Sequence, residues 1–267
     1  MKRVRLDEEM VAQGLCADRA EALRLCMAGL VSSAGERLES AATRVVPGVE
    51  IHVKGHLPYV GRGGLKLAGA LDAFQVDPSG LSCLDIGCST GGFTDCLLQR
   101  GADHVVAVDV GRAQFAWSLR NDDRVTLLER TNIVDVPDMG HARSFDLAVC
   151  DVSFTSIRVI LPAVLDLLRD SGRFLTLVKP QFEASADEVG EGGIVRDPHV
   201  HARVLQQTVA LFAESGLYPV DICASPITGT KGNREFFLLG DCGLYHACSP
   251  EELACQCTLL NDKAVNL

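Results

Sequence analysis

A glycine-rich turn between two apolar runs constrains the fold of this 267-residue chain more than any other feature. The turn lies within residues 81–110, LSCLDIGCSTGGFTDCLLQRGADHVVAVDV. An apolar run that carries Asp85 breaks into GCSTGG at residues 87–92, and a helix-like segment then leads to a second apolar run that ends at Asp109. This order of strand, glycine turn, helix, strand and acid predicts the first half of a nucleotide-binding α/β sheet, with its ligand over the carboxyl ends of the strands.

The same alternation continues through most of the chain. Further strands are predicted at residues 125–128, 145–150, 174–178, 220–225 and 236–239, and further helices at 65–74, 114–119, 157–168 and 199–216. Strands that alternate with helices usually pair in parallel, so we expect a doubly wound, Rossmann-like α/β sheet. The last two strands follow each other as a hairpin and should add an antiparallel edge.

Composition indicates an ordinary globular protein of the cytoplasm. Hydrophobic residues make up 47% of the chain and charged residues 22%. The 11 cysteines follow no disulfide spacing. No apolar run approaches the roughly 20 residues of a membrane helix, and no secretory signal is expected at the start. The net charge of −10 argues against indiscriminate polyanion binding, although residues 1–66 are slightly basic, with ten Lys and Arg against eight Asp and Glu.

Residues 1–55 have the pattern of a separate α+β module. Helices are predicted at 6–15 and 19–28, the second capped by Asp18 and ended by Gly29, and short strands follow around turns at 34–35 and 47–48. This order resembles an RNA-binding module first described in a ribosomal protein of the small subunit. A helical adaptor with solvated arginines is the alternative. The candidate phosphate contacts are Arg3, Arg5, Arg19, Arg24, Arg37 and Arg44, with Arg62 in the glycine-rich segment that follows.

The turn chemistry favours S-adenosylmethionine as the ligand of the sheet. GCSTGG lacks the G-x-G-x-x-G spacing of dinucleotide sites and the Lys-Ser/Thr pair of NTPase loops. An acid at the end of the second strand, here Asp109, hydrogen-bonds a ribose diol. An NAD-linked enzyme stays open as the alternative. The expected cofactor contacts are Asp85, Gly87, Cys88, Ser89, Thr90, Gly91, Gly92 and Asp109, with Asn132 and Ile133 beside the adenine.

Four polar residues stand at ends of elements on the ligand side of the predicted sheet. They are Lys66, Asp151, Lys179 and Glu235. Methyl transfer from a sulfonium to an alcohol needs in-line geometry and a base, because a 2′-hydroxyl is a poor acid. A lysine can be that base when burial and a neighbouring cation favour the neutral amine, and acids can orient it. Each residue alone could form a surface ion pair, but their joint position favours one catalytic site that requires no metal.

Long motifs across residues 3–240 resemble the TlyA family. The motifs are YVGRGGLKL, LDIGCSTGGFTD, VVAVDVGRAQFAWSLR, FDLAVCDVSF, LVKPQFE, GGIVRD and SPITGTKGNREFF. The resemblance implies an rRNA (cytidine-2′-O)-methyltransferase with an FtsJ-type domain of seven strands over residues 56–240. It places the family's Lys-Asp-Lys-Glu tetrad on the four residues above, with Lys179 as the base. A cytidine flipped out of ribosomal RNA is the expected substrate. Gly61 departs from the family, which usually has Ser at this position.

Residues 241–267 lie outside the resemblance, and we expect an exposed or partly disordered tail there. Its Cys and His residues do not fit the paired C-x-x-C spacing of a zinc site, so no metal is expected. Three other functions are weighed. A pore-forming haemolysin would need a membrane segment, and an rRNA-binding assembly factor without activity would have a broken tetrad. A methyltransferase for small molecules would have no use for the RNA-binding module.

Overall fold

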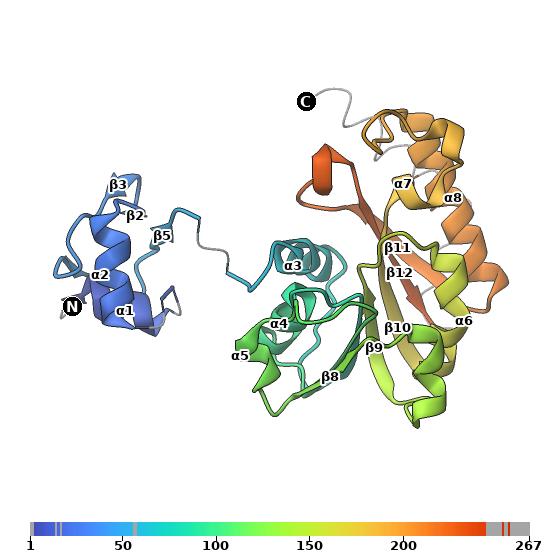
Figure 1. The fold of residues 1–267 in the computed structure, drawn as a ribbon, viewed down its shortest axis with the longest axis horizontal. Coiled ribbons are helices and arrows are strands. Elements are labelled where there is room, and N and C mark those ends of the chain that lie inside the picture. The colour runs from blue at the N-terminus through green and yellow to red at the C-terminus, as the bar shows by residue number, and fades with distance from the viewer. Residues whose placement is uncertain are drawn as a thin grey trace. The chain divides into compact units, whose positions relative to one another are not determined.

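The computed structural model describes residues 3–13, 15–16, 18–55, 58–243, 253 and 256. The chain divides into two compact units, Met1–Pro58 and Tyr59–Leu267 (Figure 1). Four of the Cys and His residues noted in the tail lie outside the described residues: His246, Cys248, Cys255 and Cys257. No helix in the described part of the chain is long and apolar enough to cross a membrane.

The first unit packs two helices against short antiparallel strands. Its elements are β1 (Val4–Arg5), α1 (Leu6–Ala12), α2 (Arg19–Met27), β2 (Val31–Ser33), β3 (Glu36–Arg37), β4 (Arg44–Val45) and β5 (His52–Val53). Strand β1 pairs with β4, and β2 lies between β3 and β5. Asp18 caps α2 as predicted, because its carboxylate accepts a hydrogen bond from the backbone N–H of Glu21 at 2.7 Å. The core of this unit includes Leu6, Met10, Ala22, Cys26 and Val31.

The second unit is built on one seven-stranded sheet. Its strands are β6 (Ser82–Ile86), β7 (His104–Asp109), β8 (Val125–Glu129), β9 (Phe145–Cys150), β10 (Leu168–Val178), β11 (Tyr218–Ala224) and β12 (Phe236–Asp241). The strand order is β11-β12-β10-β9-β6-β7-β8, and β12 runs antiparallel to both of its neighbours while the other pairs are parallel. The expected α/β class, with a mostly parallel sheet and an antiparallel edge, is confirmed.

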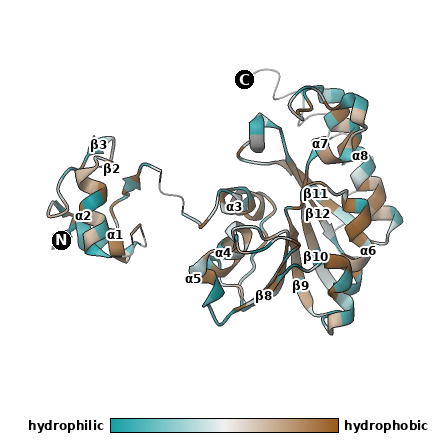
Figure 2. Ribbon diagram, viewed as in Figure 1, coloured by the Kyte–Doolittle hydropathy of each residue, from teal (hydrophilic) through white to brown (hydrophobic). Residues whose placement is uncertain are grey.

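Helices cover both faces of this sheet. They are α3 (Gly63–Ala73), α4 (Gly92–Gln99), α5 (Trp117–Arg120), α6 (Ile157–Leu167), α7 (Pro180–Glu183) and α8 (Pro198–Glu214), with short 3-10 turns η1 (Ile133–Asp135), η2 (Pro137–Met139), η3 (Ala186–Glu188) and η4 (Thr230–Gly232). Figure 1 shows α3, α4 and α5 on one side of the sheet and α6 and α8 on the other. Each side has its own apolar core, and the central strands are mainly hydrophobic in Figure 2. A sheet buried on both faces explains why its strands read as unbroken apolar runs.

Three segments differ from their sequence patterns. The helix predicted at 114–119 is shortened to α5, because Ala113 has a left-handed φ of +59° and its N–H donates to Glu129 instead of starting a helix. Strand β10 begins at Leu168 instead of residue 174, with a register irregularity before Arg173. The tail is not wholly exposed, because Leu253 is fully buried in the core beside α6 and α8, where an apolar side chain is most stable.

Candidate active site

The pairing of β6 with β9 places the glycine turn beside Asp151, one of the four catalytic candidates. Ile86 pairs with Cys150, and the N–H of Asp151 donates to the Ile86 carbonyl at 3.0 Å. Gly87 follows with a φ of +80°, and a Cβ on it would lie 3.0 Å from the backbone oxygen of Asp151. Only glycine combines this backbone conformation with so close an approach. The turn and the carboxylate are therefore held together by the sheet itself.

The pairing of β10 with β12 joins the other two strand-end residues. Val178, the last residue of β10, pairs with Phe236, the first residue of β12. Because β12 is antiparallel, Lys179 and Glu235 leave the sheet at the same edge, one after a strand and one before a strand. Lys66 reaches this edge from α3.

The four residues meet as two ion pairs. Lys66 Nζ lies 2.5 Å from Glu235 Oε2, and Lys179 Nζ lies 2.6 Å from Asp151 Oδ1. The side chains of Glu235 and Lys179 are only 3% and 8% exposed. All four line one cavity of about 550 Å³, which is within the range of about 300–1,000 Å³ typical of small-molecule sites. The structure thus brings the four predicted residues into one site. It also shows which lysine pairs with which carboxylate, which could not be read from the sequence.

Three further residues of this cavity escaped the sequence analysis. The Lys179 ammonium donates to Ser153 Oγ at 2.9 Å, and its Nζ lies 5.8 Å from the centre of the Phe182 ring. That ring lies 5.1 Å, centre to centre, from the ring of Phe154, which is 91% exposed and has a φ of +63°. All three residues occur in quoted motifs, but serine and phenylalanine are too common for their type alone to indicate a site.

The predicted cofactor residues surround the glycine turn. Asp109 Oδ2 accepts a hydrogen bond from the N–H of Ser89 at 2.7 Å, and Oδ1 accepts one from the N–H of Gly111 at 2.6 Å. Each carboxylate oxygen keeps a second lone pair for a ribose hydroxyl. A second, smaller hollow adjoins the turn, lined by Cys88, Ser89, Asp109, Gly111, Arg112, Gln114, Phe115 and Glu129. The main cavity itself is lined at the turn by Gly87, Cys88, Ser89, Thr90 and Gly92. The acceptor set and the bare backbone fit a ribose-bearing cofactor.

Four predicted cofactor residues have other surroundings. Asp85 is fully buried, accepts a hydrogen bond from Thr94 Oγ1 at 2.6 Å, and keeps Oδ1 without a partner among the described residues. Burial raises the pKa of Asp85 to about 7. Asn132 accepts a hydrogen bond from the N–H of Val134, and Ile133 lies in the apolar core. Like Asp85 and Gly91, these two residues do not line either of the two hollows described above. Gly91 caps α4 with a φ of +94°.

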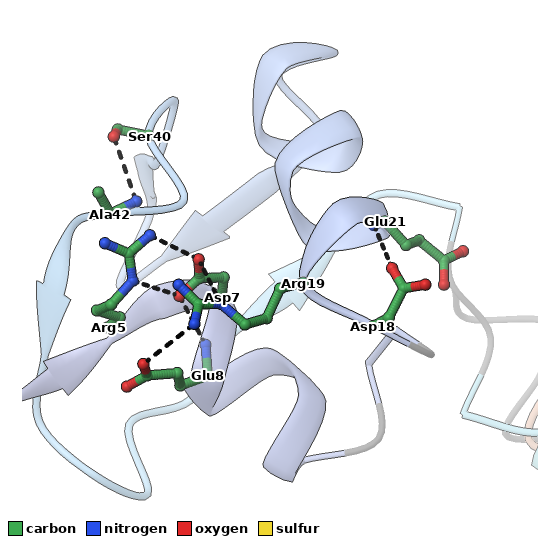
Figure 3. Close-up of polar contacts among 8 residues, drawn as sticks. All are labelled: Arg5, Asp7, Glu8, Asp18, Arg19, Glu21, Ser40 and Ala42. Carbon is green, nitrogen blue, oxygen red and sulfur yellow. Dashed lines mark hydrogen bonds and ion pairs between the residues drawn. The ribbon is translucent and has the colours of Figure 1, made fainter.

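The candidate RNA contacts of the first unit fall into two groups. Arg5 donates to both carboxylate oxygens of Asp7, at 2.9 and 2.7 Å, and Arg19 donates to Oδ2 at 3.2 Å (Figure 3). These two arginines therefore also stabilise the unit. The other predicted contacts are exposed: Arg3, Arg24, Arg37 and Arg44 in this unit, and Arg62 in the second unit.

The fold has counterparts among solved structures. A protein from Streptococcus thermophilus that carries a hemolysin name superposes with a TM-score of 0.70 at 39% identity, covering 100% of both chains. A protein from Listeria monocytogenes, described as an S-adenosylmethionine-dependent methyltransferase, shares the fold with a TM-score of 0.50 at 16% identity, over 68% of this chain and 99% of its own. The second unit therefore has a fold that is also found in an S-adenosylmethionine-dependent methyltransferase.

Comparison with related sequences shows the family to which the chain belongs. The FtsJ-like methyltransferase family matches residues 59–242. The 16S/23S rRNA (cytidine-2′-O)-methyltransferase TlyA of Mycobacterium tuberculosis is 43% identical over 239 residues, which is 89% of each chain. The chain belongs to the FtsJ-like methyltransferase family and, within it, to the TlyA proteins. The resemblance seen in the motifs is confirmed, and the cofactor is S-adenosylmethionine and not NAD.

Proposed function

We propose that this enzyme methylates the 2′-hydroxyl of a cytidine ribose in ribosomal RNA in the cytoplasm. The observation that carries the proposal is the pair of buried lysine–carboxylate contacts in one cleft beside the glycine turn. The name of the Mycobacterium tuberculosis relative supports the substrate class. An assembly factor without activity would not need this arrangement, because a structural ion pair gains nothing from lining an open cavity.

Lys179 is the proposed base. The cofactor supplies a methyl group on a sulfonium, which needs no metal to become reactive. Lys179, as the neutral amine, takes the hydroxyl proton while the ribose oxygen bonds to the methyl carbon, and the electrons of the broken C–S bond return to sulfur. Asp151 fixes the amine at 2.6 Å and stabilises the ammonium that forms. Lys66, itself paired with Glu235, places a second positive charge in the same cavity.

The aromatic residues at the cavity support a nucleotide taken out of its helix. A ring as exposed as that of Phe154 gains stability when a base stacks on it, by about 1–3 kcal/mol. Phe182 backs that ring and lies next to Lys179. A base stacked there would bring its ribose toward the lysine, so we assign Phe154 to the flipped cytidine.

The first unit is the proposed RNA-docking module. Its exposed arginines supply charges for the phosphate backbone, and the guanidinium groups held by Asp7 add two more in a fixed arrangement. The module positions the catalytic unit on folded rRNA, whose recognition depends on shape and phosphate contacts.

The test is methyl transfer from tritiated S-adenosylmethionine to ribosomal subunits that lack the modification, with the modified nucleotide mapped afterwards. We expect labelled 2′-O-methylcytidine with the wild-type protein. Lys179→Ala should lower the rate by about 100-fold or more while the cofactor still binds. Arg169→Ala is the control, because it removes a cation paired with Asp146 near the opposite ends of β9 and β10. Equal rates for Lys179→Ala and wild type, or methylation of a base nitrogen, would contradict the proposal.

A further inference from the structure

We infer that Ser153 is a positioning residue that aims the lone pair of Lys179 at the substrate hydroxyl. This inference rests on the proposed function, in which Lys179 is the base. Ser153 lies outside the lysine–carboxylate tetrad and was not among the predicted site residues. It contacts the base directly and lines the same cavity.

The geometry of the amine leaves one direction for the substrate. An ammonium has three N–H donors, and the neutral amine has two donors and one lone pair. Asp151 Oδ1 forms an ion pair with Lys179 Nζ at 2.6 Å, and Ser153 Oγ accepts a hydrogen bond from the same nitrogen at 2.9 Å. When both contacts are kept, the lone pair of the neutral amine occupies the remaining tetrahedral position. The ion pair and the hydrogen bond therefore define the direction from which a proton can reach Lys179.

The two lysines of the site differ in this respect. Among the hydrogen bonds of the described residues, Lys66 Nζ has a single side-chain acceptor, Glu235, and its amine can rotate about that contact. Lys179 Nζ contacts two residues, through its ion pair with Asp151 and its hydrogen bond to Ser153, and its side chain is only 8% exposed. An amine that must accept a proton along one direction needs such a second contact, whereas a residue that only supplies charge does not. The contrast supports Lys179 as the base and gives Ser153 a role in its action.

The backbone beside Ser153 points to the same conclusion. The next residue, Phe154, has a left-handed φ of +63°, which is unfavourable for a bulky side chain. Such strain persists when surrounding contacts require it and is common at active sites. Here the turn points the side chains of Ser153 and Phe154 toward different neighbours. Ser153 faces Lys179, and the ring of Phe154 lies against Phe182.

The experiment compares Ser153→Ala with Ser153→Thr, which keeps a hydroxyl. Steady-state rates on unmodified subunits give kcat and KM, and cofactor affinity and melting temperature are measured in parallel. We expect Ser153→Ala to lower kcat by about ten-fold or more, the effect of one hydrogen bond to a charged group. KM for RNA and cofactor affinity should change by less than about two-fold, and Ser153→Thr should recover most of kcat.

Ser156→Ala is the matched control in the same loop. Its hydroxyl caps α6 and donates to Glu183 at 2.7 Å, so this variant should lose thermal stability and keep kcat. An unchanged kcat for Ser153→Ala, a rise in KM alone, or a Thr variant no better than Ala would overturn the inference and leave the proposed function standing. Lack of methyl transfer by the wild-type protein would overturn both.

Discussion

Asp7 in the first unit and Asp151 in the second unit both hold cations, but their surroundings differ. Asp7 accepts hydrogen bonds from Arg5, Arg19 and the backbone N–H of Glu8, so all four of its acceptor positions are used, and its side chain is 5% exposed. Asp151 is 21% exposed, lines an open cavity, and pairs with Lys179, for which the described residues provide no further hydrogen-bond acceptor besides Ser153.

The role of a buried carboxylate depends on how many of its acceptor positions are used by its own chain. A carboxylate whose acceptor positions are all used by its own chain stabilises the fold, because nothing is left over for a ligand. A carboxylate that orients a lysine at the wall of a cavity leaves one N–H group or the lone pair of that lysine available to a substrate. Ion pairing alone does not separate the two cases, since both pairs are short and largely buried.

Among variants of these two carboxylates, the largest expected effect comes from removing the charge of Asp151. Asp151→Asn keeps the shape of the side chain, but it no longer supplies a full negative charge to Lys179 or stabilises the ammonium formed in the reaction. We expect kcat to fall by about 100-fold while the melting temperature stays close to that of wild type. Rates on unmodified subunits and thermal unfolding test this.

Asp170→Asn is the control for that variant. Asp170 pairs with Arg143 on the surface, and both side chains are largely exposed, so its removal should change neither activity nor stability appreciably. If Asp151→Asn instead lowered the melting temperature and kept kcat, Asp151 would be a structural carboxylate like Asp7, and the comparison would fail.

The fold was predictable because its strands are buried on both faces. Apolar runs marked the positions of β6 and β7, and the strand predicted at 145–150 coincides with β9, since a parallel sheet covered by helices has no solvent face to interrupt such runs. The helix expected at 114–119 was mostly absent, because contacts from other parts of the chain fix the preceding backbone. Ala116 N donates to the carbonyl of Thr90, which is far away in sequence.

The candidate site was predictable only in part. Position at the ends of elements identified Lys66, Asp151, Lys179 and Glu235, because strand ends gather at one edge of such a sheet. Which lysine pairs with which acid depends on strand order and on the reversed direction of β12, and neither can be read from local sequence. Ser153 had no signal for the same reason, since only the folded chain brings it to Lys179.

A smaller effect, on stability, is expected at Asp7. Hydrogen bonds from Arg5, with the charge of Arg19, lower the pKa of Asp7 to about 2 from its ordinary 3.8. The ionised carboxylate therefore stabilises the folded unit above about pH 4, and this stabilisation is lost as the pH falls from about 4 to 2. Asp7→Asn should destabilise the first unit by about 1–3 kcal/mol at pH 7 and remove this acid-dependent loss.

Hydrogen exchange of the full chain, followed on peptides from α1 and α2, measures this effect. Asp170→Asn should leave the exchange of those peptides unchanged. Faster exchange confined to the second unit, or an acid-dependent loss that survives in Asp7→Asn, would show that Asp7 does not hold the first unit together.

The smallest effect separates arginines that bind RNA from those that hold the fold. Arg24 is exposed on α2, so Arg24→Ala should weaken binding of the full chain to rRNA by a few-fold and reduce the slope of log affinity against log salt by roughly 0.7–0.9. Its melting temperature should not change. Arg5→Ala should lower both affinity and melting temperature, because it also leaves Asp7 with two unused acceptor positions in a buried place. Filter binding at several salt concentrations distinguishes the two. An unaltered salt slope in Arg24→Ala would show that Arg24 does not contact an RNA phosphate and that other residues make the electrostatic contacts.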